Sequence, residues 1–397
     1  MRRGLLGDRW RGAFVLALVA LVSALALTAC GGGSDSSSGG TTESEEASSE
    51  SAGSSSEVVA NAEKIVNPYF EPPKSIGITE PLKKKPPTGL HITALACQLV
   101  VCEGWGKQVE AAAKKLGWTA KISLFSGAPE DNLNKISAAV SEHPDAILIN
   151  GLTREGYEAA AEQAAKEGVP IVTQLGELEG KTEPPFIAVQ LSAKQFDTMS
   201  EATANWFIVD SKGEGSALAI SYAQFPLSER ITDTTAATIE RDCPDCSVKK
   251  VLVQAEDTGT KLPTTIVSEL QRDSSINYVI FQDMSMSAGV EAALREAGLQ
   301  DKVKLMGNNA TPESIKAVGE GGILGIMAFS TKAAAYQGID AIARHVEGMS
   351  LDENQEAPLM TQIFTQENLP ADATEETWSN LPVNLAEQYE KLWHVNG

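Results

Sequence analysis

Histidine is scarce in this chain of 397 residues, and the four that occur, His91, His143, His345 and His394, show no spacing typical of metal ligands. The chain also lacks a Gly-x-Ser-x-Gly elbow, a phosphate-binding loop and a dinucleotide fingerprint. Carboxylates are plentiful, but no pattern in the sequence pairs two of them for acid–base chemistry. We therefore expect neither an enzyme nor a bound metal or cofactor.

Positive charge is also in short supply. The chain has 32 Lys and Arg against 53 Asp and Glu, which gives a net charge of −21. The first 29 residues contribute +3, which leaves −24 on the remainder. Nucleic-acid binding needs stripes of Lys or Arg, and adhesion to anionic lipid needs a basic face. The acidic balance argues against both.

Long hydrophobic runs are absent apart from one near the N-terminus. Four arginines within the first 11 residues precede about fifteen apolar residues, a run too short for a comfortable membrane span and typical of a signal peptide. The run ends in Leu27-Thr28-Ala29-Cys30, which resembles the bacterial lipobox, with cleavage before Cys30 and a lipid on its sulfur. An ordinary signal peptide with a chance cysteine is the alternative. The Ser-, Gly- and Glu-rich segment that follows argues against it.

These features predict how the chain is delivered. We expect residues 1–29 to be a signal peptide and residues 30–57 to be a disordered tether, because the tether cannot bury enough apolar surface to fold. The mature protein would then be lipid-anchored at the outer face of a bacterial cell membrane. Residues 58–89 contain six prolines and predict an extended strap. Four apolar residues could dock it on the folded part: Ile65, Tyr69, Phe70 and Ile78.

Cysteine is rare as well. The four cysteines after Cys30 are an even count in an exported chain, which predicts two disulfides, most simply Cys97–Cys102 and Cys243–Cys246, although three connectivities are possible. The second pair has the Cys-x-x-Cys spacing of redox motifs. Such a motif opens a helix, whose positive end lowers the thiol pKa. Here it follows a predicted helix and precedes a predicted strand, so an exported disulfide enzyme is the least favoured function.

Alternating strands and helices organise the rest of the chain. Apolar strands are predicted at residues 91–96, 121–125, 146–150 and 169–173, with amphipathic helices between them. This alternation predicts an α/β fold with a parallel sheet covered on both faces, in which ligands bind at the carboxyl ends of the strands. From residue 192 the pattern repeats, with strands at 216–220, 248–253, 278–281, 303–307 and 323–327 and a further candidate at 360–364. The chain thus holds two such units in series.

Three segments make a family resemblance specific: residues 148–153 (LINGLT), 167–173 (EGVPIVT) and 306–312 (MGNNATP). From about residue 90 to residue 365 the chain resembles the type I periplasmic binding proteins, the ribose/galactose-binding cluster of ABC-transporter solute receptors. The resemblance implies two Rossmann-like lobes of flavodoxin-like strand order. It also implies a hinge of three crossovers, near residues 190–191, 329–330 and 360, that closes around a ligand in the cleft.

The resemblance also implies an organisation and a function. The N-terminal lobe would comprise residues 90–190 and 331–359, the C-terminal lobe residues 191–329, and the tail 360–397 would join one of them. We expect a monomeric, lipid-anchored solute-binding protein that captures a small polar ligand, a sugar above all, and delivers it to an ABC permease. A ligand-sensing surface receptor of the same fold, signalling to a membrane partner, is the alternative.

Cleft residues are expected in the loops that leave the carboxyl ends of the strands. Sugar recognition needs planar polar groups for hydroxyls and aromatic faces for C–H groups. On this basis the candidates are Gln98, Trp105, Asn150, Gln174, Tyr222, Phe225, Arg230, Asp283, Asn309 and Phe329. Three have other interpretations: Trp105 as a core residue, Asn309 as a turn residue and Arg230 as a surface charge.

The cleft sequence departs from pentose and hexose receptors at two places. Those receptors carry an Asp-Arg pair just after the fourth strand, whereas this chain has Leu175-Gly176. They also carry Asp in a Gly-Phe-Asp-Gly turn, where this chain has Asn309. Fewer carboxylates are therefore expected than in a typical hexose cleft.

Overall fold

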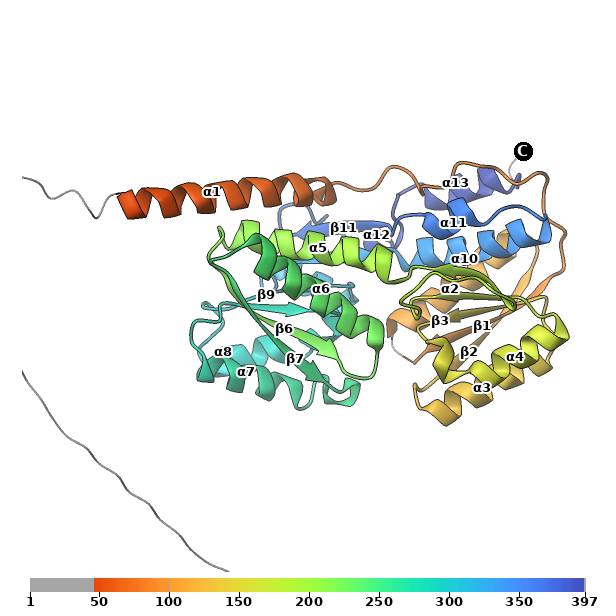
Figure 1. Cartoon of the computed structure of the whole chain (residues 1–397), viewed down its shortest axis with the longest axis horizontal. Helices are drawn as coiled ribbons and strands as arrows, with labels where there is room; N and C mark the ends of the chain where they lie inside the picture. Colours follow the sequence, from red (N-terminus) through yellow and green to blue (C-terminus); the bar gives the residue numbers. More distant parts are fainter. Residues whose placement is uncertain (1–45, 99, 396–397) are drawn as a thin grey trace, which may run out of the picture. The chain divides into compact units, whose positions relative to one another are not determined.

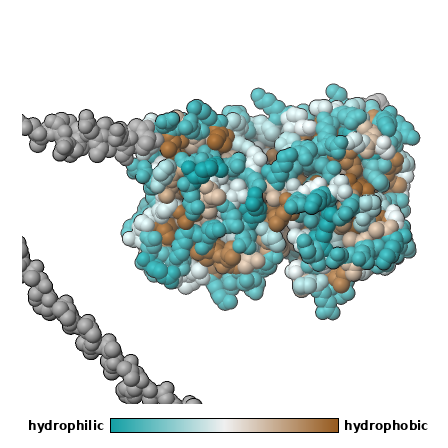
Figure 2. Space-filling view, in the orientation of Figure 1, coloured by the Kyte–Doolittle hydropathy of each residue, from teal (hydrophilic) through white to brown (hydrophobic). Residues whose placement is uncertain are grey.

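The computed structural model describes residues 46–98 and 100–395. The predicted signal peptide, Cys30 and residues 30–45 of the predicted tether lie outside the described residues. The face seen in Figure 2 is mostly hydrophilic, in keeping with the acidic composition. The described chain holds two α/β lobes (Figure 1).

The N-terminal lobe is built on a parallel sheet of five strands. They are β1 (His91–Cys97), β2 (Thr119–Phe125), β3 (Ala146–Asn150), β4 (Ile171–Gln174) and β5 (Phe186–Gln190), in the order β2-β1-β3-β4-β5. The helices are α2 (Val100–Lys115), α3 (Pro129–Ser141), α4 (Glu158–Glu167) and α10 (Thr331–Val346), with a 3-10 turn η2 (Arg154–Gly156). Figure 1 shows α2 and α10 on one face of the sheet and α3 and α4 on the other. Every residue of β3 and β4 is buried because both faces are covered.

The C-terminal lobe repeats this order and adds one antiparallel edge strand. Its strands are β6 (Ser216–Tyr222), β7 (Ser247–Val253), β8 (Tyr278–Phe281), β9 (Lys304–Asn308), β10 (Gly325–Phe329) and β11 (Thr361–Thr365), in the order β11-β10-β9-β8-β6-β7. Its helices are α5 (Ala193–Asp210), α6 (Pro226–Asp242), α7 (Leu262–Arg272), α8 (Val290–Glu296) and α9 (Pro312–Glu320), with 3-10 turns η3 (Ala255–Asp257) and η4 (Met284–Ser287). The predicted fold class, two parallel-sheet lobes of flavodoxin-like order, is confirmed.

Three segments cross between the two sheets, at the places expected. They follow β5, follow β10 and precede β11. The N–H of Ser330 donates to the carbonyl of Met360 (2.8 Å), which ties the second crossing to the third. The tail is shared between the lobes, because β11 joins the C-terminal sheet while α12 (Glu375–Ser379) and α13 (Leu385–Leu392) pack against α10.

The structure departs from the sequence prediction at the start of the described chain. Residues Glu46–Val66 form helix α1, and Asn67–Phe70 form the 3-10 turn η1, where a disordered tether and an extended strap were predicted. Ala62 and Val66 are buried one helical turn apart, so the end of α1 has an apolar stripe. The Ser- and Glu-rich composition of the preceding residues concealed this spacing.

The strap docks on both lobes, first through η1 and then through the segment that follows it. Phe70 contacts the ring of Trp206 on α5 edge-on, with ring centroids 6.5 Å apart. Ile78 and Leu82 are buried, and the N–H of Leu82 donates to the carbonyl of Leu392 in α13 (2.9 Å). Ile65, by contrast, is 45% exposed and does not dock.

A buried carboxylate holds several elements of the N-terminal lobe together. Asp340 of α10 is fully buried and accepts hydrogen bonds from Arg344 Nε (2.6 Å), Asn354 Nδ2 (2.9 Å) and Trp393 Nε1 (2.8 Å). Asn354 belongs to α11 (Asp352–Glu356), and Trp393 follows α13. Arg344 is also buried, and its Nη2 donates to the carbonyl of Glu80 in the strap (2.6 Å). One ion pair therefore joins α10, α11, the C-terminal segment and the strap.

We expect the Asp340→Ala substitution to lower the free energy of unfolding by about 3–5 kcal/mol, because it leaves the buried Arg344 guanidinium without its carboxylate. Urea unfolding followed by circular dichroism measures this loss. The matched control is Asp301→Ala, at an exposed position, which should change the stability by less than about 0.5 kcal/mol. Equal effects of the two substitutions would contradict the role given to Asp340.

Candidate ligand-binding cleft

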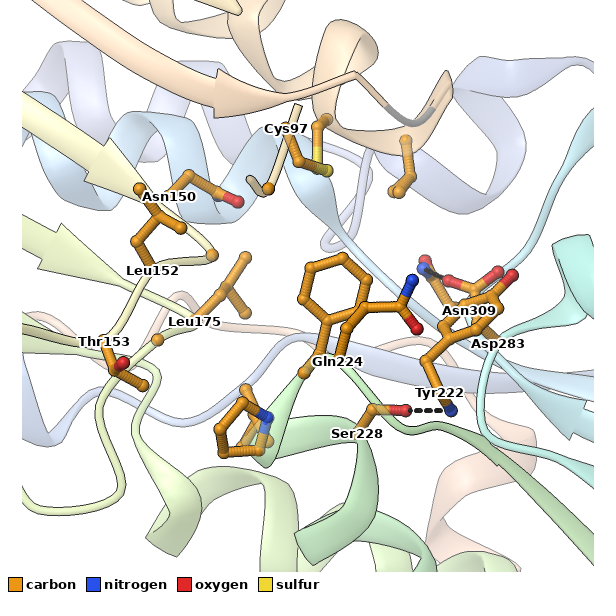
Figure 3. A pocket seen from close by; sticks show the side chains of 18 of the residues that line it. Cys97, Asn150, Leu152, Thr153, Leu175, Tyr222, Gln224, Ser228, Asp283 and Asn309 are labelled. Carbon is orange, nitrogen blue, oxygen red and sulfur yellow. Dashed lines mark hydrogen bonds between the residues drawn. A yellow bond between two sulfur atoms is a disulfide. The ribbon is translucent and has the colours of Figure 1, made fainter. Parts of the chain in front are cut away.

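The carboxyl ends of strands from both sheets border one cavity of about 320 Å³. This volume is at the lower end of the range of small-molecule sites. Residues at or after the ends of β1, β3, β4, β6, β8, β9 and β10 line it, together with the first turns of α2 and α6. The lining side chains that matter below are Trp105, Asn150, Leu152, Leu175, Tyr222, Gln224, Phe225, Leu227, Asp283, Asn309 and Phe329. Figure 3 labels seven of them: Asn150, Leu152, Leu175, Tyr222, Gln224, Asp283 and Asn309.

A hydrogen-bonded pair forms the polar end of the cavity. Asn309 Nδ2 donates to Asp283 Oδ2, and the N–H of Ser285 donates to Asp283 Oδ1 (2.8 Å). Asn309 has a φ of +64°, a left-handed backbone conformation that Asn tolerates better than most residues. The Asp283 carboxylate is 6% exposed, and its burial raises its pKa above the ordinary value.

Asn150 supplies the polar group of the opposite lobe. It is the last residue of β3 and is 2% exposed, and its Nδ2 has no hydrogen-bond partner in the described part of the protein. Figure 3 shows its side chain at the cavity. A buried donor without a partner is costly, so a ligand oxygen placed here would gain a hydrogen bond that the protein itself does not make.

Trp105 lines the cavity, and its indole N–H is directed away from the cavity. Its Nε1 donates to Gln174 Oε1 (3.1 Å). Gln174 in turn donates through Nε2 to Gln190 Oε1 (2.6 Å) and to the carbonyl of Ala334 (2.8 Å). Gln174 lies on the side of Trp105 away from the cavity and therefore fixes the orientation of its ring.

Aromatic pairs form much of the C-terminal side. Tyr222 and Phe225 pack edge to face with centroids 6.0 Å apart, and Phe196 and Phe329 do so at 5.8 Å. The Tyr222 hydroxyl lies within hydrogen-bond distance of Ser285 Oγ (3.0 Å), which fixes its ring beside the Asp283 loop. Such ring faces suit the C–H side of a sugar.

The structure brings seven of the ten predicted ligand-binding residues to the cavity wall: Trp105, Asn150, Tyr222, Phe225, Asp283, Asn309 and Phe329. Three lie elsewhere. Gln98 is exposed outside the lining, and Gln174 is fully buried behind Trp105. Arg230 is on the exposed side of α6, where its Nε and Nη2 bind the Asp197 carboxylate of α5 at 2.9 and 2.7 Å. The pairing of α5 with α6 is a tertiary contact that sequence spacing does not reveal.

The aliphatic part of the wall was not among the ten named candidates, although Leu175 and Leu227 lie in the strand-end loops expected to border the cleft. Leu152 and Leu175 follow β3 and β4, and Leu227 lies in the first turn of α6. Their positions after strand ends were a usable signal, but a search for sugar-binding side chains passes over leucine. Gln224, in the loop after β6, also lines the cavity and was not among the ten named candidates.

Both predicted cysteine pairs are disulfides in the structure. Cys97–Cys102 joins the end of β1 to the first turn of α2, and both residues line the cavity. Cys243–Cys246 joins the end of α6 to the start of β7, and neither residue lines the cavity. The first disulfide therefore fixes one wall of the cleft.

The charge of the cleft argues against an anionic ligand. Among the described residues that line it, Asp283 is the one acidic side chain, and none is Lys, Arg or His. A phosphate or carboxylate ligand would find no cation to pair with. Residues 46–98 and 100–395 also contain no cluster of His, Cys, Asp and Glu able to hold a metal ion.

Comparisons with known proteins agree with this geometry. The family described as "Periplasmic binding protein domain" matches residues 101–350. GanP, a glucose-galactose binding protein from Geobacillus stearothermophilus, is similar in structure with a TM-score of 0.61 and 15% identity, covering 72% of this chain and 100% of its own. The comparison with curated proteins found no match.

Two further solved structures are similar. The periplasmic binding protein component of the arabinose ABC transporter from Shewanella sp. ANA-3, bound to L-arabinofuranose, has a TM-score of 0.61 and 16% identity over 76% of this chain and 95% of its own. A solute binding protein from Agrobacterium vitis with bound allitol has a TM-score of 0.60 and 15% identity over 71% and 97%. At such identities the likeness shows the fold.

The buried Asp283 makes the free energy of unfolding depend on pH. Because burial raises its pKa, the folded protein keeps this proton at pH values where the unfolded chain has lost it. Its contribution therefore lowers the free energy of unfolding as pH rises from the unfolded pKa of about 3.9 through the higher folded pKa. We expect Asp283→Asn to remove this contribution, so that the stability of the variant relative to the parent increases across that window. Urea unfolding of the variant and the parent at a series of pH values measures the difference between their free energies of unfolding. A difference that does not change with pH would contradict this expectation.

Proposed function

Because the chain belongs to the periplasmic binding protein family, whose members bind solutes and are not enzymes, we propose that it is a lipid-anchored, extracytoplasmic solute-binding protein. It captures a small neutral polar ligand, a sugar or polyol, by closure of the two lobes and delivers it to an ABC permease. The observation that carries this proposal is the inter-lobe cavity in which Asn150 faces the Asp283–Asn309 pair.

The chemistry of the cavity supports a sugar. Amide and carboxylate groups from both lobes can bind hydroxyls, and closure of a hinge lets one ligand use both sets at once. Aromatic rings on the walls suit C–H faces. The three similar structures described above bind sugars or a polyol, according to their descriptions.

The membrane and permease parts of the proposal rest on other observations. The lipobox-like segment before Cys30 supports an anchor. No helix within residues 46–98 and 100–395 combines the length and apolarity needed to cross a bilayer. The ABC-transporter receptors among the similar structures support a permease as the partner.

Thermal unfolding of the mature chain against sugars, polyols, amino acids and nucleosides tests the ligand class. A ligand at 100 times its Kd should stabilise the fold by about 2.7 kcal/mol. We expect stabilisation by at least one sugar or polyol. Stabilisation by charged amino acids alone would contradict the neutral-ligand proposal.

Two substitutions then test the position of the site. Asn150→Ala and Asn309→Ala should weaken binding of that ligand by roughly two- to tenfold, the loss of a neutral hydrogen bond of about 0.5–1.5 kcal/mol. Arg230→Ala, at a position paired with Asp197 outside the cavity lining, should leave the Kd unchanged and serves as control. An affinity lost in Arg230→Ala and kept in Asn150→Ala would place the site elsewhere.

The two disulfides offer a matched pair of variants. Cys97→Ser/Cys102→Ser and Cys243→Ser/Cys246→Ser each open a short loop and should each lower stability by about 2 kcal/mol. The first double variant alone should lose affinity, by roughly two- to tenfold, because the cleft wall must then be ordered on binding. Calorimetric titration checks this. Equal Kd changes in the two double variants would argue against a role for Cys97–Cys102 in the cleft.

A further inference from the structure

The cavity wall divides into a polar end and an apolar end. Figure 3 shows Asp283, Asn309 and Tyr222 on one side and Leu152 and Leu175 on the other, where Asn150 and Thr153 also lie, with Gln224 between the two groups. A ligand that fills the cavity therefore meets polar groups at one end and, at the other, the two leucines beside Asn150 and Thr153.

The β3 and β4 turns make the apolar end. A Cβ at Gly176 would lie 1.9 Å from the carbonyl oxygen of Leu152, so the two turns pack backbone against backbone and leave no room for a side chain at position 176. Leu175 has a φ of +61° and lines the cavity beside Leu152. These two leucines are the large apolar side chains that the turns place at the cavity, beside the polar Asn150 and Thr153.

The cationic side chain beside these turns, Arg154, already has interaction partners within the protein. Arg154 stacks on the ring of Phe186, with Cζ 3.9 Å from the centroid, and its backbone N–H donates to Glu177 Oε1 (2.9 Å). Its guanidinium also lies 3.7 Å from the carboxylates of Glu177 and Glu183. Arg154 does not line the cavity.

The start of α6 adds apolar groups from the other lobe. Phe225, Pro226, Leu227 and Ile231 all line the cavity. Nearby polar groups are occupied: Ser228 Oγ accepts from the N–H of Tyr222 (2.9 Å) and donates to Gln282 Oε1 (2.7 Å). A ligand hydroxyl placed among these side chains would lose its hydrogen bonds to water and gain only apolar contacts, which is unfavourable.

We propose that the ligand is a neutral glycoside with an aryl or short alkyl aglycone, with its sugar ring between Asn150 and the Asp283–Asn309 pair and its aglycone against Leu152, Leu175 and the start of α6. This inference rests on the proposed function and narrows the ligand class. Leu175 is then a specificity-determining residue for the aglycone.

Calorimetric titration of the mature protein with matched compounds tests the proposal. The probes are D-glucose, D-galactose, D-xylose and L-arabinose, with the methyl and phenyl glycosides of each in both anomeric forms. For a sugar that binds, the phenyl glycoside should bind at least tenfold more tightly than the free sugar, with the methyl glycoside between them. Free sugars that bind as tightly as their phenyl glycosides would overturn the inference and leave the proposed function standing. No binding by any sugar, polyol or glycoside would overturn both.

The Leu175→Asn variant locates the aglycone. Asn tolerates the left-handed backbone of this position, and the ratio of two affinities in one protein does not depend on the folded fraction. The preference for the phenyl glycoside should fall to threefold or less in Leu175→Asn. It should be unchanged in Leu178→Asn, an exposed position three residues further on that lies outside the cavity lining. An unchanged preference in Leu175→Asn would refute the assignment.

Discussion

The buried carboxylate of Asp340 is the interaction on which the arrangement of the N-terminal lobe depends, and its influence extends to the cleft. Side-chain hydrogen bonds run without a break from Asp340 through Asn354, Gln190 and Gln174 to Trp105. Each amide uses its oxygen and its nitrogen in opposite directions, so every orientation in the chain is determined by the one before it. A ring that faces the ligand is thus held by the same network that fastens α10, α11 and the C-terminal segment.

Two polar groups in the cleft lower the stability of the folded protein without ligand. The Asp283 carboxylate is buried with a raised pKa, and the Asn150 Nδ2 donor has no partner within the described residues. The hydrogen bonds of Asp283 stay within the C-terminal lobe, so neither of these two groups makes a hydrogen bond from one lobe to the other. Both become favourable when a ligand hydroxyl donates to Asp283 and a ligand oxygen accepts from Asn150, so the site exchanges stability of the free protein for affinity.

The fold could be predicted because short apolar segments alternate regularly with segments in which apolar residues have helical spacing. Buried strands such as β3 and β4 are also continuous apolar runs in the sequence. Asn150 and Asp283 could be predicted too, since they stand at the ends of strands. Trp105 fits the core and the site at once, which periodicity cannot distinguish. Arg230 lies beyond the reach of sequence reasoning because its partner, Asp197, is on another helix. The docking of α1 through Val66 was masked by the composition of the residues before it.

One small neutral ligand is expected to contact both lobes at once. The crystal structure of the complex with the tightest-binding compound tests this most directly. We expect the ligand to lie between the two sheets and to contact Asn150 Nδ2 from one lobe and the Asp283 carboxylate from the other. A ligand bound to one lobe alone, or outside the cavity lined by Trp105 and Tyr222, would contradict it.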